Sequence, residues 1–180
     1  GQTTLNFRNI FYQFGILLLV ISAFLLAIFL WSLLRVALGY PTDTDAIRAL
    51  AISGCVGGAL GGACMLLTRK HDPHIGRREA LLLVAISWIG GALIGALPFF
   101  LWASFGGASD DQQPFHNFID CYFETMSGFT TTGATVLSDI EAVPKSLLLW
   151  RALTHWLGGI GIVGLFVAVL PTLGVGGKKL

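Results

Sequence analysis

Apolar residues in this chain gather into four long segments, at approximately residues 14–38, 47–67, 80–105 and 147–170. Each is long enough to cross a bilayer as a helix, which takes about 20 apolar residues. A fifth apolar stretch, residues 115–129, is too short to span the bilayer and contains Asp120 and Glu124. The pattern predicts an all-α membrane protein with four transmembrane helices and one re-entrant helix that enters the membrane and turns back.

The composition also indicates a lipid environment. Of the 180 residues, 54% are hydrophobic and only 12% are charged. A soluble domain of this size carries about a quarter charged residues. The 23 glycines fit helices that pack closely in a membrane, and Gly54, Gly58 and Gly62 recur at four-residue spacing in the second segment. We therefore expect the bilayer to be the solvent and glycine-lined faces to hold the helices together.

Basic residues gather at one end of the apolar segments. They lie before the first segment, between the second and third, and after the fourth: Arg8, Arg69, Lys70, Arg77, Arg78, Lys178 and Lys179. These are seven of the eleven basic residues, and the positive-inside rule places them in the cytoplasm together with both termini. The chain is thereby divided into two N-terminal transmembrane helices (1–67), a basic cytoplasmic loop (68–79) and a helix–loop–helix unit (80–180).

A polar run without ionisable side chains, Phe-Thr-Thr-Thr-Gly-Ala-Thr at residues 129–135, follows directly on the short helix. A potassium ion entering a narrow pore must exchange its water shell for oxygen dipoles that do not hold it too tightly. Backbone carbonyls can do this if the backbone turns sharply, which Gly133 permits, and the carboxyl end of a helix adds a favourable partial negative charge. The run is therefore predicted to line a potassium pathway. The alternative is an ordinary turn after an interfacial helix.

The same residues carry a family resemblance. The stretch ETMSGFTTTGAT at residues 124–135 resembles the first selectivity filter of the Trk/Ktr/HKT potassium transporter superfamily, and it is most similar to the bacterial Trk potassium uptake membrane subunits. Two further matches follow in the same order. These are Trp150-Arg151 with HWLGGIGI at 155–162, and LPTLGVGG at 170–177. The first two apolar segments resemble the family only in their apolar character.

The resemblance implies a fold and a site. Such proteins contain four helix–pore loop–helix repeats around one pore, preceded in bacterial Trk by two extra helices. This chain would supply the two extra helices and the first repeat, and hence one quarter of a selectivity filter. Thr131, Thr132 and Gly133 fall where the family offers backbone carbonyls to potassium, with Thr130 and Ala134 on either side.

The resemblance also implies partners. The remaining pore repeats would come from the same protein, or from further copies of this chain. The full protein would form a homodimer in the bacterial inner membrane and would bind a cytosolic nucleotide-binding regulatory subunit. No nucleic-acid partner is expected. Potassium-over-sodium preference depends on all four filter segments, of which one is present here.

Charged residues within the apolar segments are expected to pair. Asp120 and Glu124 lie four residues apart on one face of the short helix, and Arg151 lies early in the following segment. Because a lone charge at the centre of a membrane helix costs roughly 2.5–3.5 kcal/mol, we expect Glu124 or Asp120 to form a structural ion pair with Arg151. Three tryptophans are expected to act as anchors at the outer membrane interface: Trp31, Trp102 and Trp150.

Two other functions are compatible with parts of the sequence. A membrane scaffold or assembly subunit without a pore would tolerate substitution at Gly133. An intramembrane hydrolase could use Ser127 and His155, but the Gly-x-Ser-Gly signature is absent because position 125 is Thr, and a third orienting group is not evident. We therefore expect a transporter rather than an enzyme.

Overall fold

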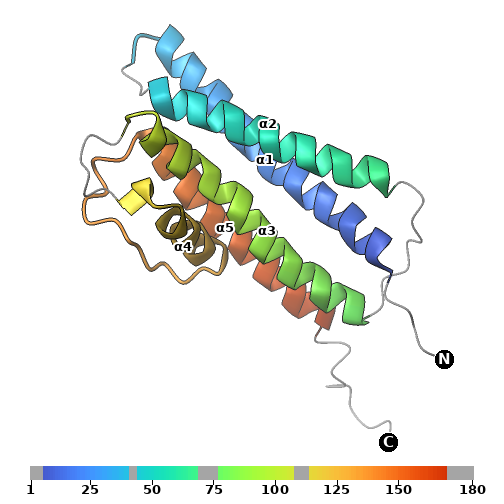
Figure 1. Cartoon of the computed structure of the whole chain (residues 1–180). Helices are drawn as coiled ribbons and strands as arrows, with labels where there is room; N and C mark the ends of the chain where they lie inside the picture. Colours follow the sequence, from blue (N-terminus) through green and yellow to red (C-terminus); the bar gives the residue numbers. More distant parts are fainter. Residues whose placement is uncertain (1–5, 41–43, 69–76, 108–113, 170–180) are drawn as a thin grey trace, which may run out of the picture.

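The computed structural model describes residues 6–40, 44–68, 77–107 and 114–169, and these residues form helices and loops without a strand. The helices are α1 (Phe7–Ala37), α2 (Thr44–Leu67), α3 (Arg77–Ser104), the 3₁₀ turn η1 (Pro114–His116), α4 (Phe118–Phe129) and α5 (Lys145–Val169) (Figure 1). By length and composition α1, α2, α3 and α5 can each cross a membrane. The predicted fold class, four transmembrane helices with one shorter helix, is confirmed. The predicted basic loop and the residues matched at 170–177 lie largely outside the described residues.

Helices α1 and α2 form an antiparallel hairpin whose contact is made by small residues. The backbones approach so closely that a Cβ atom on Gly61 would lie 2.8 Å from the carbonyl oxygen of Gly15. The Ser22 hydroxyl donates a hydrogen bond across the same interface to the carbonyl of Gly54. Gly62, by contrast, faces open space. The predicted glycine face therefore packs at Gly54 but does not extend to Gly62.

Helices α3 and α5 run side by side and form a second pair against the hairpin (Figure 1). The short α4 lies beside one half of this pair and contacts both of its helices. Pro98 lies inside α3, and the helix continues to Ser104 beyond it. This arrangement gives α4 protein neighbours on two sides, as a short helix at membrane depth requires, because its unpaired backbone ends cannot face lipid.

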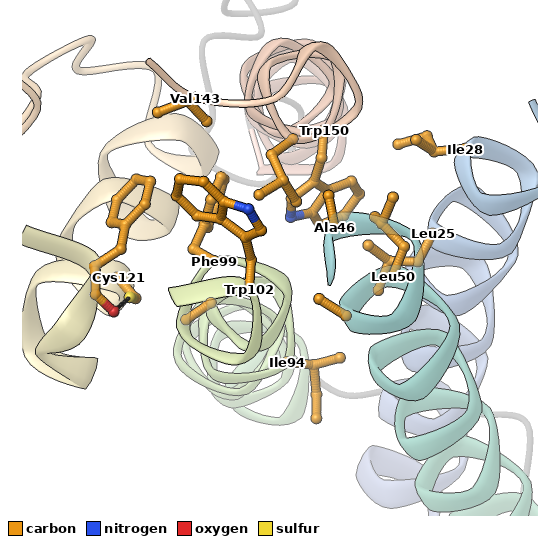
Figure 2. Close-up of a cluster of buried hydrophobic side chains, with 14 of the residues drawn as sticks. Leu25, Ile28, Ala46, Leu50, Ile94, Phe99, Trp102, Cys121, Val143 and Trp150 are labelled. Atoms are coloured by element: carbon orange, nitrogen blue, oxygen red, sulfur yellow. Dashed lines mark hydrogen bonds between the residues drawn. The ribbon is translucent and has the colours of Figure 1, made fainter. Parts of the chain in front are cut away.

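Two tryptophans that were expected at the membrane interface lie in the protein core instead. Trp102 is 1% exposed and Trp150 is fully buried, within the cluster of apolar side chains shown in Figure 2. The indole Nε1–H of Trp150 donates to the carbonyl of Gly95 at 2.8 Å. An indole needs one polar partner, and here the backbone of a neighbouring helix supplies it in place of the headgroup region. Trp31 does stay partly exposed, with the Arg35 guanidinium 5.1 Å from its ring centroid.

Candidate functional site: the loop that follows α4

Helix α4 begins at a side-chain cap and is only 12 residues long. The Asn117 side chain accepts a hydrogen bond from the Ile119 amide at 3.0 Å, which satisfies one of the free amides of the first turn. At 1.5 Å per residue the helix extends about 18 Å, well short of the roughly 30 Å hydrocarbon core of a bilayer. The sequence-predicted short helix is therefore present, and it cannot span the membrane by itself.

Glycines on both neighbouring helices allow α4 to fit between them. A Cβ atom on Gly95 of α3 would lie 2.6 Å from the Thr125 methyl group of α4. On the other side, a Cβ atom on Gly158 of α5 would collide with the backbone of Phe129, the last residue of α4. These contacts fix the depth and direction of the carboxyl end of α4, from which the polar loop emerges.

The first residues of the loop fold back onto the end of α4. The Thr130 amide donates to the Met126 carbonyl, and the Thr131 amide donates to the Gly128 carbonyl, both at 2.9 Å. The Thr132 amide reaches further back, to the Ser127 carbonyl at 2.9 Å. Amides are thereby turned toward the helix, where they pair with carbonyls of its last turn that would otherwise have no helical partner.

Two residues of the loop adopt left-handed backbone conformations. Thr131 has φ = 56° and Gly133 has φ = 77°. A Cβ atom added to Gly133 would meet nothing within 4 Å, so glycine is needed there for its backbone angles and not for space. A left-handed threonine is uncommon, and such strained residues gather at functional sites.

The carbonyl groups of the loop divide into engaged and free ones. The Thr130 carbonyl accepts the Thr131 hydroxyl at 2.7 Å, and the Ala134 carbonyl accepts the Ser127 hydroxyl at 2.6 Å. Within the part of the chain that the structure describes, no hydrogen bond ends on the carbonyls of Thr131, Thr132 or Gly133. All three residues are exposed. Three successive carbonyls are thus free to act as ligands, between two that are engaged.

The Glu124 carboxylate ties α4 to the far side of the loop and to α5. Glu124 is 1% exposed. It accepts the Thr135 hydroxyl at 3.0 and 2.9 Å on its two oxygens and the Val136 amide at 3.0 Å. Arg151 of α5 forms an ion pair with it through Nε. Asp120, the other acid considered for this pair, is half-buried one turn earlier and is not part of it.

The two residues of the hydrolase alternative each bond to another group of the protein. The Ser127 hydroxyl donates to the Ala134 carbonyl at 2.6 Å, and the His155 Nδ1 lies 2.9 Å from the Arg151 carbonyl. No hydrogen bond between Ser127 and His155 is present among the described residues. In the same part of the chain no group of three or more His, Cys, Asp or Glu residues could hold a metal ion.

Known proteins with similar sequences and structures are membrane transporters. Residues 47–180 match the family described as TrkH, cation transport protein. The Trk system potassium uptake protein TrkH of Vibrio parahaemolyticus is 34% identical over 177 residues, which are 98% of this chain and 33% of that protein. TrkG of Escherichia coli, another Trk system potassium uptake protein, is 38% identical over 121 residues, 67% of this chain and 23% of TrkG.

A solved structure agrees with these sequence matches. The crystal structure of the potassium transporter TrkH from Vibrio parahaemolyticus matches this chain with a TM-score of 0.78 at 32% sequence identity. The match covers 96% of this chain and 34% of that one. The chain thus spans about a third of the length of these full-length relatives.

Proposed function

Because this chain belongs to the TrkH family of cation transport proteins, we propose that it supplies one quarter of the selectivity filter of a potassium uptake transporter. The observation that carries the proposal is the row of free carbonyls at Thr131, Thr132 and Gly133, between the engaged carbonyls of Thr130 and Ala134. The names of the relatives support potassium as the transported ion. Potassium is here the substrate in transit and not a resident cofactor.

The loop has the features that selective passage of potassium requires. Carbonyl dipoles replace the water shell of the ion without the strong binding that a fixed carboxylate would impose. The carboxyl end of α4 is directed into the loop and adds a partial negative charge that favours cations. Threonine hydroxyls hold the loop in shape, since Thr130 bonds to the Met126 carbonyl at 2.8 Å and lies 2.8 Å from the Thr132 hydroxyl.

The rest of the pore lies outside this chain in our proposal. Further repeats of the same protein complete the filter, which is supported by relatives about three times as long. The transporter resides in the bacterial cytoplasmic membrane with both ends of this segment in the cytoplasm, as the distribution of basic residues supports. A homodimer and a cytosolic nucleotide-binding regulatory subunit rest on the family resemblance alone.

A substitution at Gly133 tests the filter proposal. In a strain that lacks its own potassium uptake, the full-length protein is compared with its Gly133→Ser and Gly39→Ser variants. Gly39 is a matched control because its φ of 80° and its open surroundings resemble those of Gly133, whereas it lies between α1 and α2. Gly133→Ser should lower potassium uptake or the preference of the transporter for potassium over sodium. Gly39→Ser should change neither. If the chain were part of a pore-less scaffold, both variants would have the same potassium uptake and the same preference for potassium over sodium. That result would overturn the proposal.

A further inference from the structure

We propose that Glu124 is a positioning residue of the filter. Its carboxylate holds Thr135 and Val136, at the end of the filter loop, and it thereby sets the placement of the three free carbonyls and the ion preference of the site. This inference rests on the proposed function, because it assigns a role to a residue that does not itself face the ion pathway.

Both oxygens of the buried carboxylate accept hydrogen bonds from protein donors. One oxygen accepts the Thr135 hydroxyl at 3.0 Å and pairs with Arg151, and the other accepts Thr135 at 2.9 Å and the Val136 amide at 3.0 Å. A carboxylate offers about four acceptor positions, and three protein donors take up most of them: the Thr135 hydroxyl, the Val136 amide and Arg151 Nε. The Glu124 side chain itself has no exposed surface. Glu124 therefore lacks the access to serve as an ion ligand, and its charge is already paired with Arg151.

The free carbonyls lie between two anchored points. On the helix side, the Thr131 and Thr132 amides are bonded to the last turn of α4 at 2.9 Å each. On the other side, Glu124 holds Thr135 and Val136, while the Ser127 hydroxyl holds the Ala134 carbonyl. Both anchors belong to α4, so the loop begins and ends on the same rigid helix. A shift of Thr135 would move Gly133, which lies two residues away.

The bonds from Glu124 to Thr135 and Val136 form a clamp on the end of the loop. Arg151 makes this clamp compatible with a cation pathway. The charge of a buried carboxylate would otherwise be uncompensated, which is strongly destabilising, and it would also attract cations away from the carbonyls. Pairing with Arg151 of α5 cancels that charge and attaches the clamp to a membrane-spanning helix. The clamp thus fixes geometry without adding a net charge beside the filter.

Ion preference is the property that the clamp should control. Discrimination between potassium and sodium depends on how many carbonyl dipoles surround the ion and how rigidly they are held. A filter loop that is no longer held at Thr135 and Val136 should still pass ions but should discriminate less between potassium and sodium. An exclusively structural role would instead change the amount of transporter in the membrane.

The test compares four variants of the full-length transporter, with sodium inhibition of potassium uptake as the readout. Thr135→Val removes the hydroxyl from an exposed residue, and Glu124→Gln removes the charge from the carboxylate. Thr135→Ser keeps the hydroxyl and is the matched control for the first. Asp120→Asn makes the same acid-to-amide change on the same helix outside the clamp, and it is the matched control for the second.

We expect Thr135→Val and Glu124→Gln to lower the preference for potassium over sodium about tenfold, as the loss of one hydrogen bond to a charged group would. Thr135→Ser and Asp120→Asn should retain the wild-type preference. Uptake is normalised to the amount of protein in the membrane. If Glu124→Gln fails to accumulate there, the ion preference of Thr135→Val tests the proposal.

Two outcomes separate this inference from the proposed function. If Thr135→Val reaches the membrane at wild-type amounts and keeps its ion preference, while Gly133→Ser changes it, the clamp is refuted and the filter stands. If the wild-type protein shows no potassium uptake, the filter itself is refuted, and the clamp inference is refuted with it.

Discussion

Gly158 of α5 lies directly against the backbone of Phe129, the residue with which α4 ends. An added Cβ atom would lie 2.6 Å from the Phe129 carbonyl carbon and 2.7 Å from its Cα, closer than real contacts allow. Backbone cannot move aside as a flexible side chain can. This contact therefore sets where α4 stops and where the polar loop begins.

Gly158→Ala should displace the end of α4 and destabilise the protein by about 1–3 kcal/mol, the usual cost of overpacking. The thermal unfolding midpoint of the purified protein in detergent should fall, and potassium uptake should fall with it. Gly161→Ala is the matched control, because this glycine lies on the same helix and a Cβ there would meet nothing within 4 Å. Equal midpoints for the two variants would show that the contact is not as tight as the structure has it.

Gly95→Ala should also destabilise the packing of α4, and here a second substitution can relieve the clash. The new Cβ would lie 2.6 Å from the Thr125 methyl group. Thr125→Ser removes that methyl group and keeps the hydroxyl that donates to the Cys121 carbonyl at 2.9 Å. The double variant should therefore unfold at a higher temperature than Gly95→Ala alone, by the equivalent of about 1 kcal/mol. Strict additivity of the two changes would argue against direct contact.

Arg151→Gln should be more damaging than its loss of charge suggests. It leaves the Glu124 carboxylate buried without its ionic partner, which costs about 3–5 kcal/mol in other proteins. Adding Glu124→Gln should recover part of this loss, with a coupling of at least about 1 kcal/mol in a double-mutant cycle of unfolding midpoints. The expected result fails if the double variant is as unstable as the sum of the single ones.

A surface ion pair provides the control for that cycle. Arg48 lies 3.7 Å from Asp45 near the start of α2, and the Arg48 side chain is 68% exposed. Arg48→Gln should cost less than about 1 kcal/mol, because exposed ion pairs contribute little.

Trp150→Phe should destabilise the core by about 1 kcal/mol or more. The substitution removes the hydrogen bond to the Gly95 carbonyl and leaves space among buried side chains. Trp156→Phe, on the same helix but with the tryptophan 57% exposed, should have a much smaller effect on the unfolding midpoint. Comparable shifts for both would place Trp150 at the membrane interface, as its sequence position had suggested.

The helices and the polar loop after α4 could be predicted because they depend on local patterns. Apolar segments of spanning length and one shorter stretch indicate the all-α membrane fold, and the run of Thr and Gly after the short stretch indicates a polar loop. The need for glycine at 133 likewise follows from a backbone angle, which is a local property.

Contacts between distant segments could not be predicted in the same way. Helical spacing places Asp120 and Glu124 on one face of α4, but it does not show that Glu124 alone reaches Arg151. It also gave no signal for the bonds from Glu124 to Thr135 and Val136, since those depend on where the loop turns back.

Trp102 and Trp150 were predicted at the membrane interface, and not in the core, for a related reason. An amphipathic ring near the end of a membrane helix suits either the interface or a polar partner inside, and only the neighbouring helices decide.

In the proposed filter, the carbonyls of Thr131, Thr132 and Gly133 hold potassium in transit. Anomalous diffraction from crystals of the full-length transporter, with thallium or rubidium in place of potassium, tests it most directly. Anomalous density should appear in contact with these carbonyls, and it should be lost or displaced in Gly133→Ser. Density elsewhere along the pore, with none beside these three carbonyls, would contradict it.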